Sequence, residues 1–403
     1  MTQNTEVVVL GGGYAGVMAA NRLTQRDAVT VTLINPRPVF VHRIRLHQVV
    51  GGSHDVVVDY REVLAESVRL VVDTAARIDA TEHSVALAAG GTVGYDYLIY
   101  AVGSGSADPQ VPGAAEFAYP IAALEEAQRL WSVLDAAPAT AAVTVVGAGV
   151  LGIETAAELA EAGRTVTLVC GEVLGPYLHP RVRRSIANRL AKLGVTVLEG
   201  PDAKVTAVTR DAVRLGGDRE LPSAVTVWTA GFGVPDLALR SGLSTDALGR
   251  LLTDETLTSV DDVRIVAAGD SAAPSALPLR MSCQAAGPLG AHAADTVLSR
   301  IAGEQPASID VGFFGLCVSL GRHAATVQLA SKDDTANRFS IRGRVAVKIK
   351  ESSYKGLLKR LADEARKPGS HTWPFKNDKR RQLLEAKRDK APAVRTAHRL
   401  TDS

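Results

Sequence analysis

The sequence predicts an α/β protein with two parallel-sheet units, the second inserted into the first, followed by a C-terminal α+β appendix. Three observations predict this: the length of 403 residues, a glycine-rich strand-to-helix pattern that occurs twice, and a basic C-terminal segment. At roughly 100–200 residues per domain, the length indicates two to four domains. Hydrophobic residues make up 46% and charged residues 22% of the chain, as in ordinary globular proteins. Wholly disordered, collagen-like and coiled-coil chains are therefore excluded.

The first unit begins with a short β-branched run that leads into glycines. Residues 6–23 read EVVVLGGGYAGVMAANRL, and residues 142–159 repeat the pattern as AVTVVGAGVLGIETAAEL. Each copy is followed by a second strand-like run, VTVTLIN at 29–35 and TVTLVC at 165–170. The offset of 136 residues from Gly11 to Gly147 is too long for a solenoid repeat. It fits two separate nucleotide-binding domains.

Both copies fit the pattern G-x-G-x-x-G, with Gly11, Gly13 and Gly16 in the first and Gly147, Gly149 and Gly152 in the second. In this pattern the first glycine makes a tight turn, the second lets the backbone approach a pyrophosphate, and the third lets helix and strand pack closely. The pyrophosphate then lies on the helix N-terminus, where free N–H groups favour an anion. Each copy lies between a strand pattern and a helix pattern, as the motif requires. The sequence therefore predicts two dinucleotide sites.

Two dinucleotides in one chain indicate a flavin and a nicotinamide, of which one accepts a hydride and the other delivers it. Two further strand ends support this interpretation. Residues 96–103 read DYLIYAVG, and residues 263–271 read VRIVAAGDS, ending in Gly269 and Asp270. An acidic residue just past a strand can bind the ribityl chain of FAD. The alternative for Asp270 is a helix N-cap or a turn residue.

With these motifs, residues 5–330 resemble the two-dinucleotide-binding-domain flavoproteins, the glutathione-reductase-like or pyridine nucleotide-disulfide oxidoreductase superfamily. The resemblance implies two Rossmann-like domains and the cofactors FAD and NADH or NADPH. It divides the chain into an FAD-binding domain (1–117 and 255–325), an NAD(P)H-binding domain (118–254), a C-terminal interface or membrane-docking region (326–375) and a basic, mobile tail (376–403).

The resemblance also carries site residues over to this chain. For FAD it implies Gly11, Gly13, Tyr14, Ala15, Gly16, Asn35, Arg43, Ala101, Gly103, Gly269 and Asp270. For the nicotinamide dinucleotide it implies Gly147, Gly149, Leu151, Gly152, Glu172, Ala230 and Gly231. Asn35 replaces the usual acidic residue at the FAD adenosine ribose. Glu172 can take the ribose 2′-hydroxyl of NADH, while Arg164 before the strand leaves NADPH open.

The segment 35–52, NPRPVFVHRIRLHQVVGG, lacks the cysteine or cysteine pair of the disulfide reductases in this superfamily. We interpret Cys283 and Cys317, far downstream, as small buried hydrophobes. Electrons are therefore expected to pass directly from the reduced flavin to a quinone, an iron–sulfur or haem protein, a dye or oxygen.

Within the superfamily the chain looks most like type II NADH:quinone oxidoreductases and apoptosis-inducing-factor-like flavoproteins. The likeness lies in GGGYAG, the 40–52 loop, Glu154 after the second glycine loop, and the VWTAG turn at 227–231. It implies an enzyme, an NAD(P)H dehydrogenase with a quinone-like acceptor. Two alternatives stay open: a soluble reductase of an electron-carrier protein or biosynthetic substrate, and a redox-signalling flavoprotein with slow turnover.

Three residues are catalytic candidates. Glu154 would orient the nicotinamide or couple protons, or it would serve only the helix dipole. His42, in the loop facing the flavin, could supply a proton for quinone reduction, as could its neighbour His47. Gln284 matches the first glutamine of a quinone-site motif AQxxxQ, but Pro288 occupies the place of the second.

The C-terminal segment differs in charge from the rest. Residues 341–403 contain 18 Lys and Arg against 7 Asp and Glu, so an acidic body carries a basic tail. The tail could meet an anionic membrane or a polyanion, or remain solvated. Residues 344–350 alternate like a half-buried strand, and residues 354–365 have one apolar helical face. That face could lie on a membrane, on the flavin domain or on a dimer partner.

Features that the sequence lacks exclude some classes of function and indicate a location for the protein. The chain has no apolar run of 18 residues and no secretion signal, so we expect no spanning helix and no export. Three cysteines fit a reducing compartment. We expect a cytoplasmic protein, peripheral on the inner face of the membrane, with no metal. No helix-turn-helix or zinc motif indicates specific nucleic-acid binding.

Overall fold

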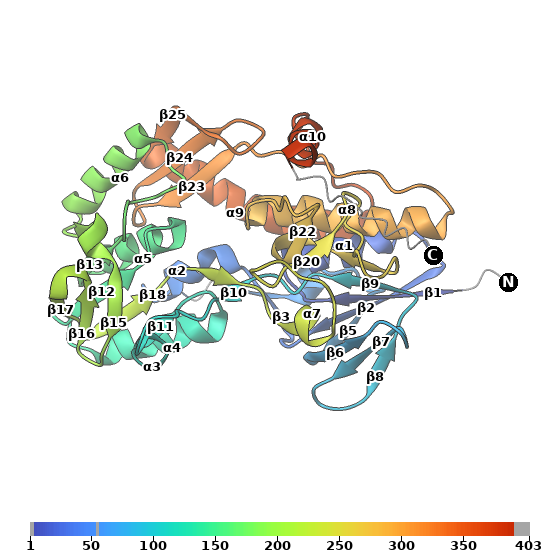
Figure 1. Cartoon of the computed structure of the whole chain (residues 1–403), viewed down its shortest axis with the longest axis horizontal. Coiled ribbons are helices and arrows are strands. Elements are labelled where there is room, and N and C mark those ends of the chain that lie inside the picture. The colour runs from blue at the N-terminus through green and yellow to red at the C-terminus, as the bar shows by residue number, and fades with distance from the viewer. Residues whose placement is uncertain (1–3, 54–55, 391–403) are drawn as a thin grey trace, which may run out of the picture.

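A computed structural model describes residues 4–53 and 56–390 of the chain (Figure 1). The first unit contains a five-stranded parallel sheet in the order β21-β9-β1-β2-β5. Its strands are β1 (Thr5–Leu10), β2 (Val29–Asn35), β5 (Arg69–Val72), β9 (Tyr97–Tyr100) and β21 (Ile265–Ala267). Strand β1 is a continuous buried apolar run from Val7 to Leu10, as expected for a parallel strand covered on both faces. Two helices that pack against each other, α1 (Tyr14–Leu23) and α8 (Cys283–Ile301), cover one face.

The second unit repeats this architecture. Its parallel sheet has the order β11-β18-β12-β13-β14. The strands are β11 (Ala118–Pro120), β12 (Ala142–Val146), β13 (Thr165–Val169), β14 (Thr196–Leu198) and β18 (Val225–Trp228), and the helices are α4 (Leu124–Ala136), α5 (Val150–Glu161) and α6 (Pro180–Lys192). The chain leaves the first sheet after β9 and returns to it at β21, so the second unit is inserted in the first. The predicted fold class is confirmed.

The repeat extends beyond the glycine loops. Each unit carries an antiparallel three-stranded meander, which precedes β9 in the first unit and β18 in the second. These are β6 (Ala75–Asp79), β7 (Ser84–Leu87) and β8 (Thr92–Gly94) in the first unit, and β15 (Val205–Val208), β16 (Ala212–Leu215) and β17 (Glu220–Pro222) in the second. The sequence analysis did not predict these meanders, because their strands are short and differ in sequence.

Short elements complete the two units. Paired strands are β3 (Val39–Val41) with β4 (Val57–Asp59), β10 (Gly105–Ser106) with β19 (Phe232–Gly233), and β20 (Leu251–Thr253) with β22 (Ala272–Pro274). Short helices are α2 (Leu46–Val49), α3 (Ala114–Phe117) and α7 (Leu237–Arg240), with single 3-10 turns at Arg43–Arg45, Tyr60–Glu62, Pro201–Ala203, Gly216–Asp218 and Gly269–Ser271.

The appendix consists of an antiparallel sheet and two helices. Strands β23 (Gly315–Ser319), β24 (Ala325–Ala330) and β25 (Ala336–Arg342) precede α9 (Gly343–Arg366) and α10 (Arg380–Lys390). Figure 1 shows α9 running from the orange sheet of the appendix, beside the second unit, toward the first. It contacts both β24 and α1. Because β23 pairs with β24, the appendix sheet starts at Gly315, ten residues or so before the boundary expected from sequence.

The prediction of a strand at 344–350 is wrong, because these residues form the first turns of α9. Ala346, Lys350 and Tyr354 are buried at a spacing of four residues, which is a helical period, whereas Val345 is 60% exposed. The alternation of valines and isoleucine is thus not what determined the local structure. The apolar face predicted for residues 354–365 packs on the protein itself, since Tyr354 and Leu361 are buried.

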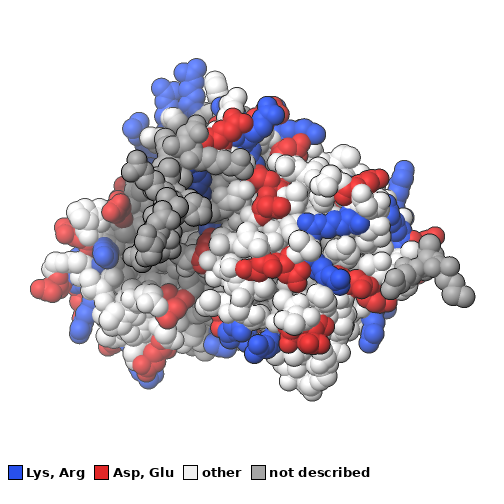
Figure 2. Space-filling model, turned by 45° about the vertical axis from the view of Figure 1, so that its right-hand side comes forward, with Lys and Arg blue, Asp and Glu red and all other residues white. Residues whose placement is uncertain are grey.

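The basic segment is partly neutralised by the acidic body. Ion pairs join Lys350 to Glu154, Lys376 to Asp310, Lys379 to Asp333, and Arg380 to Glu255. Residues 376–390 belong to the tail expected to be mobile, and they include α10, whose first residue, Arg380, is buried. The remaining tail residues, 391–403, lie outside the described part. On the face drawn in Figure 2, blue and red residues are intermingled, as such pairing predicts.

Among residues 4–53 and 56–390, no helix combines the length and hydropathy needed to span a bilayer.

Candidate functional site

The first glycine loop has the geometry that a bound pyrophosphate requires. Gly11 has a φ of +99°, and a Cβ added there would lie 2.4 Å from the carbonyl oxygen of Ala101. A Cβ on Gly16 would lie 1.8 Å from the Gly11 oxygen, so β1 and α1 pack with no room for a side chain. A Cβ on Gly13, in contrast, would meet no atom within 4 Å. The loop is therefore tight toward the protein and open at the N-terminus of α1, where Tyr14 and Ala15 follow.

The second loop has the same geometry. Gly147 has a φ of +113°, and a Cβ on Gly152 would lie 1.8 Å from its oxygen. Gly149, at the N-terminus of α5, faces open space like Gly13. The Thr229 hydroxyl donates to the carbonyl oxygens of Val146 (2.9 Å) and Gly147 (3.1 Å) and so holds the end of β18 against the loop. This brings Ala230 and Gly231 to the edge of the second loop, and both loops fit a dinucleotide.

Asn35 holds the first glycine loop in place through hydrogen bonds. Its Oδ1 accepts a hydrogen bond from the Gly12 N–H (2.9 Å), and its Nδ2 donates to the Arg37 carbonyl (2.8 Å). The Tyr60 hydroxyl donates to the Gly12 carbonyl (2.8 Å). Both polar ends of the Asn35 side chain are thus used within the protein, where the sequence analysis expected contact with a ribose.

Asp270 joins three segments of the first unit. Its carboxylate accepts hydrogen bonds from the Ser104 hydroxyl (2.7 Å) and the Ser282 N–H at the start of α8 (3.0 Å). Arg43 donates to the same Ser104 hydroxyl (3.0 Å), and burial lowers the pKa of its guanidinium. Ser104 directly follows Gly103, so the structure brings Arg43, Gly103 and Asp270 together, as the sequence analysis predicted for one cofactor.

Glu154 lies in a buried ion pair that links the second unit to the appendix. It is 6% exposed, and its Oε1 accepts from the Lys350 Nζ and from the Ser319 N–H (2.9 Å). Although burial disfavours a charged amine, the Glu154 carboxylate raises the pKa of Lys350 above its usual value. His47 Nδ1 lies 3.6 Å from Glu154 Oε2. Burial lowers the pKa of His47 to about 4, so near neutral pH Lys350 is the cation of the pair.

A chain of aromatic side chains continues from Lys350 toward the first glycine loop. The Tyr354 ring centroid lies 5.5 Å from Lys350 Nζ and 4.8 Å from Arg45 Cζ. The ring of His42 lies 5.8 Å from that of Tyr354, and its Nδ1 is 2.9 Å from the Tyr14 hydroxyl. Burial lowers the pKa of His42 to about 4. Two of the predicted catalytic residues, Glu154 and His42, therefore lie at the two ends of one buried polar cluster.

The third candidate, Gln284, lies in the wall of a narrow slot between α1, α8 and α9. Its amide oxygen accepts from the Phe314 N–H (3.1 Å). The slot is lined mainly by apolar or neutral side chains, among them Tyr14, Cys283, Gln284, Gly287, Leu357 and Trp373. Pro288 is buried inside α8 and also borders the slot. The slot thus reaches from the first glycine loop to the C-terminal appendix.

The two remaining predicted residues lie at the second loop. Leu151 is in the first turn of α5, and the exposed Glu172 follows β13, with its carbonyl accepting from the Gly200 N–H (3.1 Å). The sequence analysis missed Lys350 and Tyr354, which are separated from Glu154 by about 200 residues. The four-residue spacing of Ala346, Lys350 and Tyr354 is a helical period and could have indicated that these side chains share one face of a helix.

Comparison with known proteins agrees with this geometry. The sequence pattern of the pyridine nucleotide-disulphide oxidoreductase family matches residues 5–294. An NADH dehydrogenase-like protein of Mycobacterium tuberculosis is 29% identical over 351 residues, covering 80% of this chain and 87% of the relative. The type II NADH:quinone oxidoreductase of Staphylococcus haemolyticus is 23% identical over 382 residues, covering 84% and 93%.

Two solved structures share the fold. The sulfide:quinone oxidoreductase of Aquifex aeolicus superposes with a TM-score of 0.76 at 19% identity, covering 89% of this chain and 92% of the other. NDH2 of Plasmodium falciparum in complex with NADH has a TM-score of 0.76 at 16% identity, covering 90% and 97%. At these identities the likeness concerns the fold.

Proposed function

Because the chain belongs to the pyridine nucleotide-disulphide oxidoreductase family, we propose that it is an NADH dehydrogenase that reduces a quinone-like acceptor directly. Membership makes it a flavoprotein oxidoreductase that uses FAD and a nicotinamide dinucleotide. When bound, FAD takes up a hydride from the nicotinamide and passes two electrons on. We propose, in addition, the acceptor, the site residues and the domain limits.

In this proposal residues 1–117 and 255–325 hold FAD and residues 118–254 hold NADH. Gly13 and Gly149 would face the two pyrophosphates, since both leave open space at a helix N-terminus. Asp270, Arg43 and Gly103 would border the FAD, while Asn35 would act by holding the first loop in place. Glu172, Ala230 and Gly231 would border the nicotinamide dinucleotide.

The observation that carries the proposal is the buried cluster from Glu154 through Lys350 and Tyr354 to His42. Reduction of a quinone consumes two protons, and a dry site must supply them through side chains. Lys350 holds a proton at Nζ because Glu154 stabilises its charge. Burial lowers the pKa of His42 and His47 to about 4, so both rings are neutral near pH 7 and are weak proton acceptors there. In this proposal the cluster holds one proton, on Lys350 Nζ, where the second unit meets the appendix.

The cysteines support direct transfer to the acceptor. Cys170, Cys283 and Cys317 all lie in the described part of the chain and are free thiols. Burial raises the pKa of Cys170 to about 12 and that of Cys283 to about 11. Such thiols keep their protons at neutral pH and are poor nucleophiles. A dithiol relay therefore has little support.

The slot beside Gln284 supports a small acceptor with an apolar ring. Its walls are largely apolar and aromatic, and they begin at Tyr14 next to the first glycine loop. Such a lining suits a quinone better than the charged surface of a carrier protein, but the slot has a volume of only about 10 Å³, so its walls would have to move apart before a quinone could enter. A homodimer, predicted from sequence as an alternative use of the appendix, stays a prediction.

The proposed contact with an anionic membrane is the outer edge of the appendix. Phe339 on β25 is 59% exposed and Val345 at the start of α9 is 60% exposed. The basic Arg338, Arg342 and Arg344 lie between or beside them in sequence. Exposed apolar side chains flanked by arginine are the combination that binds an anionic lipid surface. A peripheral location on the inner face follows from this proposal.

Anaerobic stopped-flow spectroscopy tests the proposed function. The FAD-loaded protein is mixed with NADH or NADPH while the flavin absorbance is followed, and then with a short-chain quinone or with air. We expect fast reduction by NADH and fast reoxidation by the quinone. A long-lived reduced flavin in the presence of quinone would contradict the acceptor and favour a protein acceptor or a redox-signalling role.

A further inference from the structure

A wide pouch lies beside the slot, at the C-terminal end of α9. Its volume is about 490 Å³, within the range of small-molecule sites. Its wall includes Arg360, Asp363, Arg366, Lys367, Ser370 and His371. Arg360 and His371 also line the slot, so the two spaces share a wall.

The pouch has an excess of positive charge that the protein does not neutralise. Its carboxylate, Asp363, is already paired with Lys359 and lies 3.5 Å from Arg366. Arg360 and Lys367 make no ion pair or side-chain hydrogen bond with any residue that the structure describes. Arg360 is half-buried, and burial lowers the pKa of its guanidinium. A partly desolvated guanidinium without an anion gains strongly from binding one.

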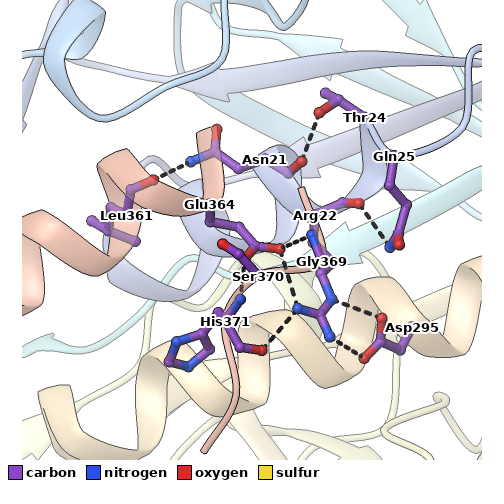
Figure 3. Close-up of polar contacts among 10 residues, drawn as sticks. All are labelled: Asn21, Arg22, Thr24, Gln25, Asp295, Leu361, Glu364, Gly369, Ser370 and His371. Atoms are coloured by element: carbon purple, nitrogen blue, oxygen red, sulfur yellow. Dashed lines mark hydrogen bonds and ion pairs between the residues drawn. The ribbon is translucent and has the colours of Figure 1, made fainter. Parts of the chain in front are cut away.

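His371 supplies the second, independent observation. The residue is 8% exposed, and its Nε2 is buried with no hydrogen-bond partner among the described residues. In Figure 3 the interactions of His371 end on its backbone, and no dashed line reaches the ring. A buried imidazole nitrogen without a partner is unfavourable unless a ligand or water completes it.

The wall that carries His371 is held in place by Glu364. This carboxylate is fully buried and accepts from the N–H groups of Gly369 (2.7 Å) and His371 (2.6 Å). Arg22 on α1 donates to Glu364 (3.2 Å) and to the His371 carbonyl (3.0 Å), and also pairs with Asp295 on α8 (Figure 3). The position of the imidazole is thus set by α1, α8 and α9 together.

We propose that the pouch binds an oxyanion of the phosphate or carboxylate class, with Arg360 and Lys367 neutralising its charge and a small shift of the His371 ring, whose Nε2 is covered in this structure, completing a hydrogen bond to it. The planar fork of a guanidinium matches such a group. Burial lowers the pKa of His371, so the ring is neutral and can donate from Nε2 in the appropriate tautomer. The inference holds whatever acceptor the enzyme uses. Because the slot adjoins the pouch, the anion could be free phosphate or the head group of an amphiphile.

Isothermal titration calorimetry on the full-length, FAD-loaded protein tests the proposal. One arm uses inorganic phosphate and the other dihexanoyl phosphatidic acid below its micelle concentration. We expect Arg360→Gln to weaken binding about tenfold or more, with unchanged FAD content and melting temperature. The matched control is Arg219→Gln, which removes the same charge from an exposed position in the second unit, away from the appendix. Lys367→Gln, also exposed, is the second variant should Arg360→Gln fail to fold.

Equal affinity for the two ligands would support a site for a free oxyanion, and tighter binding of the lipid would support an amphiphile that reaches the slot. Absence of binding in both arms would overturn the proposal. So would equal weakening by Arg219→Gln and Arg360→Gln, because that would mean general attraction to a basic surface. Neither readout involves turnover, so failure here is separate from failure of the proposed quinone reduction.

Discussion

Lys350 and Glu154 form the interaction on which the proposed proton route depends. Both side chains are about 7% exposed, and they come from α9 and α5, which the sequence separates widely. This contact joins three parts of the molecule, because His47 of the first unit also lies next to Glu154. A single substitution at this point should therefore affect both stability and catalysis.

Removal of one partner should leave an uncompensated buried charge. We expect Glu154→Gln to destabilise the fold by about 3–5 kcal/mol, whereas Glu154→Gln combined with Lys350→Met should recover much of that loss. The matched control, Glu351→Gln, breaks the more exposed pair with Arg45 and should cost about 1 kcal/mol or less. Thermal unfolding followed by circular dichroism measures all three. Equal effects of the two glutamate substitutions would contradict the structural role of the pair.

The buried histidines predict a loss of stability in mild acid. The pKa of His47 is lowered to about 4, so the unfolded chain binds a proton between about pH 6.5 and pH 4 and the folded chain does not. Stability is fully present above pH 6.5 and falls as the pH drops toward 4, by up to about 3 kcal/mol for this residue. The melting temperature between pH 7 and pH 5 should fall less steeply in His47→Gln. The exposed His323→Gln is the control and should keep the slope of the unsubstituted protein.

At the scale of elements, the two glycine loops are two copies of one strand-turn-helix unit. In each, one glycine makes the turn, one is packed against the turn, and one faces open space. These roles can be separated by adding one methyl group at a time, because the space available differs at each position.

Gly149→Ala and Gly152→Ala should separate binding from folding. The methyl group at residue 149 meets no protein atom within 4 Å, so the melting temperature should stay within about 1 °C, while the KM for NADH should rise roughly tenfold as the methyl group obstructs the pyrophosphate. At residue 152 the methyl group would collide with the Gly147 carbonyl and should lower the yield of folded protein. Steady-state kinetics with NADH and a dye acceptor provide the measurement. An unchanged KM for Gly149→Ala would argue against a nucleotide at this loop.

At the scale of the molecule, the appendix contacts both dinucleotide-binding units and so connects them. Helix α9 packs on α1 and β24, closes the slot and places Lys350 beside Glu154. The basic residues that follow it pair with acidic residues of the body. The charge asymmetry of the sequence is thus partly an intramolecular docking contact, and the edge around Phe339 and Val345 is the surface that we propose for a membrane.

Phe339→Ser combined with Val345→Ser should weaken binding to anionic liposomes about tenfold, because both apolar side chains would leave the lipid. Dye reduction by NADH should be unchanged, since neither residue touches the slot or the glycine loops. Co-sedimentation with phosphatidylglycerol vesicles measures binding, and Leu248→Ser, which changes an exposed apolar residue outside the appendix, is the control. Binding that is insensitive to the double substitution would place any membrane contact elsewhere.

The sequence by itself determined the two Rossmann-like units, their nesting and the glycine loops, because these depend on local patterns: β-branched runs, glycine spacing and helical periodicity. Asn35, Gly103 and Asp270 could be placed near one site for the same reason, as each lies at the end of a parallel strand or three residues beyond it. Only the tertiary structure decided the helical state of residues 344–350, where burial every fourth residue outweighed an alternating pattern. It also decided the pairing of Lys350 with Glu154 and the pouch around Arg360 and His371. Lys350 and Glu154 are 196 residues apart, and the wall of the pouch is held by Arg22, 342 residues before Glu364. The stability of such contacts comes from packing that no local window of sequence contains.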